Sequence, residues 1–316
     1  MEPEMILVTG GSGYLGSHIV RRLAAEGHAV RALVRSLDAV RQEQRLAGVT
    51  VELVQGDVTE PASLAPALAD VSAIIHTVAI AIERRGATYE QVNTQGTLHV
   101  LQAAQSAGVK RFINISQLGA DATLPYRFLA SKGRAQEAVA ASDLAWTAFR
   151  PSVIWGPEDE FANTFARLIP LTPIIFPIVG GPQARFQPVW VEDVVSAVAA
   201  SLDDPATHGE EYELGGPEVL TLEQIERRTL EAIGARRIMV RFPMPLLRLA
   251  VRAMEALLPN PPVTSSLLEL LAVSNVTTNN ALPRFVGQPS PFTAQAAAEY
   301  MRTFTVRDTL RQYLGR

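Results

Sequence analysis

The sequence contains no cysteine among its 316 residues. Disulfide bonds, thiolate metal sites and cysteine nucleophiles are therefore excluded, and a cytoplasmic location fits this composition. The chain also has no excess of positive charge, because 28 Lys and Arg residues face 32 Asp and Glu residues, giving a net charge of −4. Nucleic-acid binders usually carry a basic patch, so we expect no nucleic-acid partner.

The sequence also lacks long apolar runs. It has no stretch of about 18 uncharged apolar residues with helical character, so we expect no membrane-spanning helix. The nearest case, residues 168–182, is apolar but contains four prolines, and we interpret it as a loop-rich wall. Residues 1–4 are acidic and show no signal-peptide pattern. We find no internal repeat or low-complexity segment, and we predict no metal site.

A glycine-rich segment follows an apolar run of strand length at residues 5–8. Gly10, Gly13 and Gly16 have the spacing G-x-x-G-x-x-G, and helical periodicity continues after them. A strand, a glycine-rich turn and a helix form a phosphate cradle, because N–H groups at the helix start face the ligand and the helix dipole favours its charge. Glycine permits the sharp turn and the close approach of the backbone to pyrophosphate. The segment predicts a dinucleotide-binding site.

Strand and helix patterns alternate through the first half of the chain. The expected strands are residues 5–8, 28–34, 49–54, 72–77, 111–115 and 145–149, and the expected helices are residues 14–26, 36–46, 61–69, 88–107 and 125–141. This alternation predicts an α/β fold with a doubly wound parallel Rossmann sheet, whose ligands lie at the carboxyl ends of the strands. We expect this NAD(P)-binding domain to cover residues 1–155.

Proline becomes frequent after Arg150 and the alternation stops. The expected elements are a turn and an extended segment at residues 180–189, helices at residues 189–202 and 221–233, and a short strand at residues 211–214. Thr221 and Gln224 have the spacing of a capping box at the start of the second helix. We expect residues 156–316 to form a smaller, mainly helical substrate- or partner-binding region packed on the first domain.

The end of the second expected strand bears on the choice between NAD and NADP. An acidic residue about 20 positions after the glycines would accept hydrogen bonds from the ribose 2′-hydroxyl. This strand instead ends in Val34 and Arg35, with no Asp or Glu. Arg35 offers donors suited to a 2′-phosphate, so we favour NADP(H), with NAD(H) as the alternative. The other interpretation of Arg35 is a solvated arginine at a strand end.

Two further strand ends are candidates for the cofactor site. Asp57 follows the third strand, and it either contacts the adenine edge or stabilises a turn. His76 closes the fourth strand, where the crevice of a doubly wound sheet should open. We interpret His76 as a lining residue and not as a catalyst, because a single histidine at a strand end is more often a packed residue.

Several motifs together resemble the extended and atypical short-chain dehydrogenase/reductase superfamily, which is also the NAD-dependent epimerase/dehydratase superfamily. They are the glycine motif, residues 56–58, 93–97, 114–116, Lys132 and residues 150–157, and they cover most of residues 5–160 in order. Residues 115–121 and 187–194 look like the branch related to the 39 kDa NADH–ubiquinone oxidoreductase subunit. The expected cofactor contacts are Gly10, Ser12, Gly13, Tyr14, Leu15, Gly16, Arg35, Asp57, Val58, Thr77, Val78, Ala79, Lys132, Pro151 and Val153.

In active members of that superfamily, a tyrosine four residues before a lysine exchanges a proton with the substrate, and a serine on the preceding strand orients the substrate. This spacing places both side chains on one helix face, because a turn has about 3.6 residues. The position four residues before Lys132 is Phe128, which has no proton to give. The resemblance makes Ser116, Lys132 and Asn93 provisional catalytic positions, Asn93 as the helix asparagine that supports the proton path.

Tyr126 is the other tyrosine near this motif. It lies six residues before Lys132, so the two side chains would point about 240° apart on a regular helix. An irregular helix start at Pro125 would change that angle. We interpret Tyr126 as a residue that lines the pocket or covers the core, with the role of acid as the alternative.

These observations predict an NADP(H)-binding protein in which the nucleotide has a structural, sensing or slow redox role at a hydrophobic, quinone-like pocket. Hydride transfer needs only a positioned nicotinamide, so reduction of a quinone would not require the phenol. One alternative is an active NAD(P)-dependent reductase, dehydrogenase or epimerase for a small or nucleotide-linked substrate. Another is a scaffold whose Rossmann domain is a platform for a partner.

Residues 245–258 form an amphipathic pattern, with Arg241, Arg248 and Arg252 nearby. One interpretation is a helix packed on the substrate region. The other is a hydrophobic lid, a surface for a protein partner, or a contact with an anionic membrane surface, to which the protein would be peripheral. Residues 264–316 carry no motif.

Overall fold

The computed structural model describes residues 4–84, 86–178, 183–258, 261, 263–301 and 304–314. The chain divides into two compact units. The first contains Met1–Pro151, Val191–Leu214 and Asn279–Gln288, and the second contains Ser152–Trp190, Gly215–Thr278 and Pro289–Arg316. The units are thus discontinuous in sequence, unlike the single division at residue 155 that we expected, because later segments return to the first unit.

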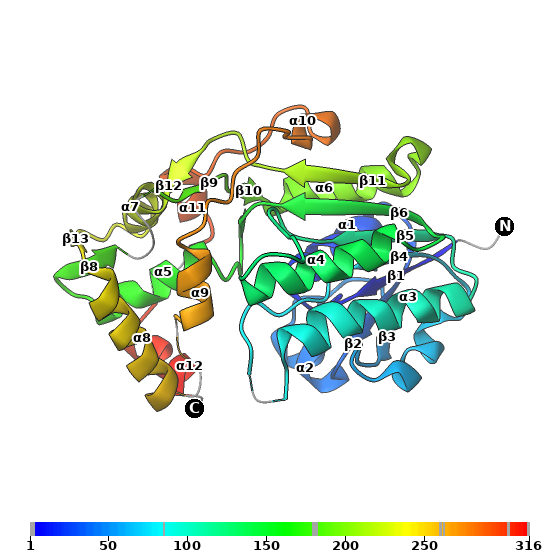
Figure 1. The fold of residues 1–316 in the computed structure, drawn as a ribbon, viewed down its shortest axis with the longest axis horizontal. Helices are drawn as coiled ribbons and strands as arrows, with labels where there is room; N and C mark the ends of the chain where they lie inside the picture. The colour runs from blue at the N-terminus through cyan, green and yellow to red at the C-terminus, as the bar shows by residue number, and fades with distance from the viewer. Residues whose placement is uncertain are drawn as a thin grey trace. The chain divides into compact units, whose positions relative to one another are not determined.

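A seven-stranded sheet forms the centre of the first unit (Figure 1). All its neighbouring strands are parallel, in the order β11-β6-β5-β4-β1-β2-β3. The strands are Met5–Thr9 (β1), Ala29–Val34 (β2), Glu52–Gln55 (β3), Val71–His76 (β4), Arg111–Ile115 (β5), Ala145–Pro151 (β6) and Glu210–Leu214 (β11). The strand order reverses between β1 and β4, which opens a crevice at their carboxyl ends. The predicted doubly wound parallel fold is confirmed.

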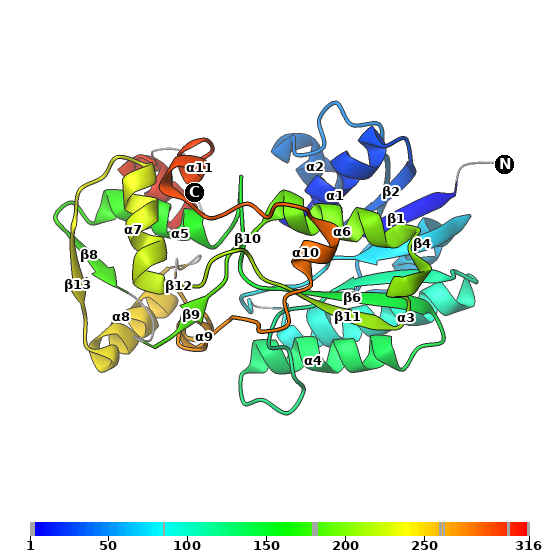
Figure 2. The ribbon, with the colours of Figure 1, turned by 90° about the horizontal axis from the view of Figure 1, so that it is seen from above.

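Helices cover both faces of this sheet. Helix α1 (Tyr14–Ala25) contacts α6 (Val191–Leu202) on one face, and α3 (Gly96–Ser106) contacts α4 (Arg127–Ala140) on the other (Figure 1, Figure 2). Helix α2 (Leu37–Glu43) connects β2 and β3. The inner strands are buried on both sides, which explains why they appear in the sequence as continuous apolar runs.

Two expected helices of the first unit differ from the structure. Residues 61–69 form two short 3-10 turns, Pro61–Ser63 and Ala65–Leu68, and not one helix. Pro66 explains the break, because proline has no N–H to donate and its ring clashes with the carbonyl group four residues earlier. The expected helix at residues 88–107 begins with a π-helical segment, Glu90–Gln95, before the regular turns of α3.

The second unit combines short helices with three two-stranded pairs, β7–β10, β9–β12 and β8–β13. Its elements are β7 (Ile154–Trp155), α5 (Ala162–Leu168), β8 (Ile175–Ile178), β9 (Arg185–Phe186), β10 (Val189–Trp190), β12 (Leu220–Thr221), α7 (Leu222–Ala232), β13 (Ile238–Arg241), α8 (Met244–Leu257), α9 (Ser265–Leu270), α11 (Ala294–Ala298) and α12 (Val306–Leu314). Its core is built on Trp155, Phe165, Phe176, Phe186 and Phe292. The predicted capping box of Thr221 and Gln224 is present at the start of α7.

The prediction of a loop-rich wall at residues 168–182 is partly wrong. Residues Ile175–Ile178 form strand β8, which pairs in parallel with β13. Pro177 is compatible with this strand, because proline is tolerated in an edge strand. Residues 179–182, which include the start of the turn expected at 180–189, lie outside the described residues. None of the described helices is long and apolar enough to cross a bilayer.

Candidate functional site

The glycine loop lies between β1 and α1, at the carboxyl edge of the sheet. Gly10 has a φ of +72°, and a Cβ there would lie 2.7 Å from Thr77 Oγ1. A Cβ on Gly16 would overlap the backbone oxygen of Gly10, so the first turn of α1 packs directly on the loop. Gly13 is the N-cap of α1 and brings no side chain between the first N–H groups and a ligand. The cradle thus fits a pyrophosphate group.

The other predicted loop residues lie beside these glycines. Leu15 is buried in the first turn of α1, and the Tyr14 ring meets the His18 ring edge-on at 5.5 Å between centroids. The backbone oxygen of Ser12 accepts a hydrogen bond of 3.3 Å from Nη1 of Arg45. No sequence motif marks Arg45, because it reaches the loop only through the fold. It is a cation at the cradle that the sequence pattern does not indicate.

Thr77 ties the ends of β1 and β4 together. Its backbone N–H and its hydroxyl both donate to the backbone oxygen of Thr9, at 3.2 and 2.8 Å. Val78 is half-buried, and a Cβ on Gly10 would lie 3.1 Å from its Cγ2, whereas the next residue, Ala79, is exposed. The predicted cofactor contacts of the β4 end are therefore near the glycine loop.

His76 is the centre of a buried hydrogen-bond chain. Its Nδ1 lies 2.7 Å from Thr9 Oγ1 and its Nε2 lies 3.0 Å from Thr97 Oγ1. Thr97 donates its own hydroxyl hydrogen to the backbone oxygen of Asn93 at 2.7 Å, so His76 donates from Nε2 and accepts at Nδ1. Burial, and secondarily the charge of Lys132, lower the pKa of His76 to about 3. His76 is thus a neutral residue that connects the ends of β1 and β4 to the first turn of α3.

Asn93 lies in the π-helical segment before α3 and is fully buried. Its Oδ1 accepts from the backbone N–H of Ile80 at 2.8 Å, and its Nδ2 donates to the backbone oxygen of Ile80 at 3.2 Å and to Ser131 Oγ at 3.1 Å. The side chain therefore fixes the loop after β4 to helix α4. π-helical turns are frequent at functional sites. The extra residue in this turn contributes to the position of Asn93 and of the start of α3.

Ser116 directly follows β5, and the side chain of Lys132 reaches the same strand end from α4. Lys132 is buried, and its Nζ donates 2.7 Å to the backbone oxygen of Ile115. Burial lowers the pKa of this ammonium group to about 8. Ser116 is 4% exposed, and its Oγ has no hydrogen-bond partner among the described residues. A buried hydroxyl without a partner costs free energy unless a ligand satisfies it, so this position fits a bound substrate or cofactor.

Phe128 occupies the position one helical turn before Lys132 on α4. It is half-buried, and its ring meets the Tyr89 ring edge-on at a centroid distance of 5.7 Å. Tyr89 donates its hydroxyl hydrogen to the backbone oxygen of Ala81 at 2.8 Å. Tyr126 is the N-cap of α4, in extended conformation, and lies outside the helix. The i, i+4 position is thus held by an apolar ring.

Arg35 and Asp57 follow β2 and β3. The Arg35 side chain is exposed. This exposure is compatible with both interpretations, a contact with an anionic ligand and a solvated arginine at a strand end. Asp57 Oδ1 accepts from the backbone N–H and the hydroxyl of Thr59, at 2.9 and 2.8 Å. This Asx turn is the structural role that we weighed for Asp57. Val58 is buried and its backbone oxygen lies 2.8 Å from His99 Nδ1.

The remaining predicted contacts belong to different units. Pro151 ends β6 in the first unit, and its backbone oxygen accepts from the N–H of Leu118 at 2.9 Å. Val153 belongs to the second unit, where its N–H donates to Asn275 Oδ1 at 3.0 Å. Among the described residues, no group of three or more His, Asp or Glu side chains is placed to hold a metal ion.

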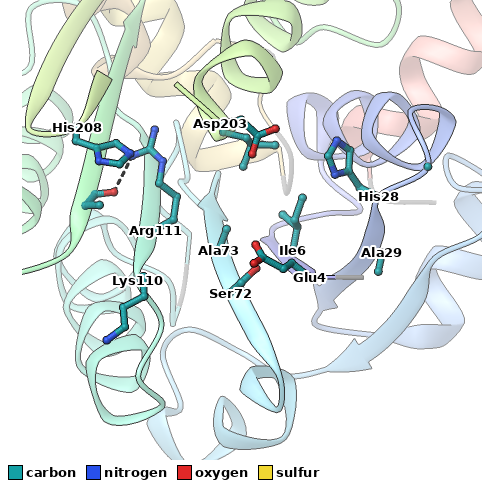
Figure 3. A pocket seen from close by; sticks show the side chains of 13 residues that line it. Glu4, Ile6, His28, Ala29, Ser72, Ala73, Lys110, Arg111, Asp203 and His208 are labelled. Atoms are coloured by element: carbon teal, nitrogen blue, oxygen red, sulfur yellow. Dashed lines mark hydrogen bonds between the residues drawn. The ribbon is translucent and has the colours of Figure 1, made fainter. Parts of the chain in front are cut away.

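A pocket of about 480 Å³ opens at the opposite edge of the sheet (Figure 3). It is lined by residues from the amino ends of the strands, among them Ile6, Ala29 and Ala73. Arg111 lies in its wall and donates to the backbone oxygen of Ala145 at 2.6 Å. Because ligands of doubly wound sheets bind at the carboxyl ends, this pocket is separate from the dinucleotide cradle.

The fold and the cradle define an NAD(P)-binding Rossmann-fold protein. Residues 10–165 match the family model described as NAD(P)H-binding. The chain is 30% identical, over 331 residues, to a 3 beta-hydroxysteroid dehydrogenase/Delta 5→4-isomerase of Mycobacterium tuberculosis, with 92% of this chain and 88% of that protein covered. The chain belongs to the extended short-chain dehydrogenase/reductase family.

The chain is also similar to a subunit of a respiratory enzyme in sequence and to an epimerase in fold. NADH dehydrogenase (ubiquinone) 1 alpha subcomplex subunit 9, mitochondrial, of Arabidopsis thaliana is 30% identical over 243 residues, which are 76% of this chain and 60% of the subunit. The expected resemblance to the 39 kDa subunit branch is confirmed. The UDP-glucose 4-epimerase of Thermus thermophilus, solved in complex with NAD, shares the fold with a TM-score of 0.71, 20% identity and coverage of 95% and 98% of the two chains.

Proposed function

We propose that the protein binds NADP(H) at the glycine cradle and does not use a phenol as proton donor. The nucleotide then has a structural or sensing role, or serves slow redox chemistry on a quinone-like, hydrophobic acceptor. The observation that carries this proposal is the pair on α4: Lys132 is retained and buried, while the position one turn before it is Phe128.

The residues at the end of β5 support binding more than acid–base chemistry. The Lys132 ammonium group lies beside the strand end and would hold a hydroxyl of the nicotinamide ribose, and Ser116 offers an unsatisfied hydroxyl. When bound, the reduced nicotinamide supplies a hydride. A quinone that accepts a hydride becomes a hydroquinone anion, which can take its proton from water. A ketone would form a far more basic alkoxide and needs a nearby acid.

The preference for NADP(H) rests on the end of β2. Arg35 is exposed beside the N-terminus of α2, and its guanidinium can donate to a 2′-phosphate. Ser36 caps α2 by accepting from the N–H of Ala39 at 3.2 Å, so its hydroxyl is engaged in the helix start. Arg45, which already contacts the glycine loop, adds a second cation on this side of the cradle.

The second candidate is an active NAD(P)-dependent dehydrogenase, reductase or epimerase. It is favoured by the 30% identity to a steroid dehydrogenase over 92% of this chain. In that case another group supplies the proton, and Tyr126 at the N-cap of α4 and Lys132 are the candidates in this region.

Phe128→Tyr separates the two functions. We expect wild-type protein to bind NADPH and to reduce a soluble benzoquinone slowly, and the variant to gain reduction of ketones while quinone reduction stays unchanged. Phe128→Leu is the matched control, because it alters the same position without adding a hydroxyl. Ketone reduction by the wild type as fast as by Phe128→Tyr would favour the second candidate, and absence of binding of NADPH and NADH by calorimetry would overturn both.

A further inference from the structure

Helix α8 has two apolar faces, of which only one is used for packing. Val251 is fully buried and forms a cluster with Val263 and with Leu268 of α9. Met244, Leu247 and Met254 pack against the same cluster from α8. This inner face packs as the amphipathic pattern predicts. It contains only some of the apolar residues of α8.

The second face of α8 is exposed. Leu246, Leu249 and Leu257 are 57%, 66% and 79% exposed. At about 100° per residue they fall, with Ala250 and Ala253, within one sector of the helix that points away from Val251. We call these five residues the outer face of α8. The exposed side of a surface helix is normally polar, so an outer face of leucine and alanine indicates a binding surface.

Exposed apolar side chains continue into the segment that leads to α8. Phe242, between β13 and α8, is 44% exposed. Ile238 of β13 and Ile175 of β8 are 62% and 45% exposed, and they are paired across the two strands. Figure 2 shows α8 directly after β13 at the β8–β13 end of the second unit. The apolar surface is thus larger than one helix.

The charges beside the outer face are positive. Arg248 and Arg252 lie one turn apart on α8, both exposed, and neither forms an ion pair with a described residue. Glu255 accepts from the backbone N–H and the hydroxyl of Ser265, at 2.8 and 2.7 Å, so its carboxylate is engaged at the start of α9. The leucines of the outer face therefore lie on the same helix as two arginines that pair with no described acidic residue.

We propose that the outer face of α8 docks on an anionic lipid bilayer, with the helix lying in the interface plane. Apolar side chains beside unpaired arginines suit a surface that offers hydrocarbon below a layer of negative headgroups. In a two-fold dimer through the outer face, the partner surface is the same set of leucines and alanines, which offers no negative charge to Arg248 and Arg252. The proposal does not depend on the nucleotide or on any turnover.

Flotation with vesicles tests the docking. Wild-type protein is mixed with vesicles of phosphatidylcholine, or of phosphatidylcholine with phosphatidylglycerol, at low and high salt. We expect flotation with the anionic vesicles alone, and a decrease as the Debye length falls from about 30 Å at 0.01 M salt to about 10 Å at 0.1 M. Leu249→Asp should reduce flotation about tenfold, since it places a charge on the outer face. Arg248→Gln with Arg252→Gln should remove the preference for anionic vesicles.

Val219→Ser is the matched control, because Val219 is 54% exposed in the same unit but lies outside α8. Its flotation should equal that of the wild type, and all variants should keep the wild-type circular dichroism and NADPH affinity. No flotation with either vesicle type at low salt would overturn the proposal. A dimer in light scattering that Leu249→Asp dissociates, without vesicle binding, would assign the outer face to a second copy and also overturn it.

Discussion

Lys132 donates a hydrogen bond of 2.7 Å from its Nζ to the backbone oxygen of Ile115, the last residue of β5. The contact joins α4 to the strand end that precedes Ser116, and it places an ammonium group in a buried position. Burial lowers the pKa of Lys132 from 10.5 to about 8. The site thus contains a cation whose charge opposes folding unless an electron-rich ligand lies beside it.

This lowered pKa predicts a dependence of stability on pH. Between pH 8 and 10.5 the unfolded chain binds more protons at Lys132 than the folded chain, so the free energy of unfolding rises with pH in that window. Lys132→Met should stabilise the protein at pH 7 by about 2 kcal/mol, since a shift of one pKa unit corresponds to about 1.4 kcal/mol and the hydrogen bond to Ile115 is lost. Urea unfolding at several pH values measures both effects. The exposed Lys110→Met is the control, and an equal difference from wild type at pH 7.5 and pH 10.5 would contradict the lowered pKa.

Arg35→Ala tests the preference for NADP(H). Loss of a charge-assisted contact to the 2′-phosphate should weaken NADPH binding by about tenfold or more, and NADH binding should change little. Arg41→Ala is the matched control, because Arg41 lies on α2 and pairs with Asp38 at 3.2 Å. Isothermal titration calorimetry of wild type, Arg35→Ala and Arg41→Ala with NADPH and with NADH gives the six dissociation constants. Equal losses for both nucleotides would assign the 2′-phosphate contact elsewhere.

Gly16→Ala tests the packing of α1 on the glycine loop. The added Cβ would overlap the backbone oxygen of Gly10, so either the loop or the helix start must move. We expect a loss of about 3 kcal/mol in the free energy of unfolding and a large loss of nucleotide affinity. Gly287→Ala, where a Cβ meets no atom within 4 Å, should leave both unchanged. Thermal unfolding followed by circular dichroism, with and without NADPH, distinguishes these results.

Asp159 gives a second prediction about pH, in the second unit. It is fully buried and accepts hydrogen bonds from the N–H groups of Phe161 and Ala162, at 2.7 and 2.6 Å. Burial exceeds the effect of these bonds and raises its pKa from 3.8 to about 6. The folded chain therefore binds more protons between pH 3.8 and 6, and the stability that Asp159 contributes is lost as pH rises through 6. Asp159→Asn should lack this slope in urea unfolding, whereas Asp143→Asn, at an exposed position, should retain it.

The parts of the fold that local sequence determines were predictable. The apolar run of β1, the spacing of Gly10, Gly13 and Gly16 and the helical pattern of α1 are adjacent in the chain, so their order alone indicates the cradle. The position of β11 in the sheet was not predictable, because Glu210–Leu214 pairs with β6, about 60 residues earlier. Pairing at that distance depends on the whole fold and leaves no local pattern.

The same distinction applies to the site. Phe128 and Lys132 lie four residues apart on one helix, so their relationship was visible from spacing. The environment of His76 was not, because its partners Thr9 and Thr97 come from separate elements. The two faces of α8 also required the structure, because Leu246 and Leu247 are neighbours in an apolar pattern and only their exposure assigns them to different sides.

The discontinuous first unit has a consequence for synthesis of the chain. When Pro151 has been made, six of the seven strands exist, and β6 (Ala145–Pro151) is an open edge of the sheet. Its partner β11 is completed only at Leu214, which at 5 to 20 residues per second takes roughly 3 to 13 s more. During that interval the growing chain presents an unpaired strand edge, a template for pairing with another chain. Between these two points of translation, β6, which is an interior strand of the finished sheet, is therefore expected to be open to pairing with another chain.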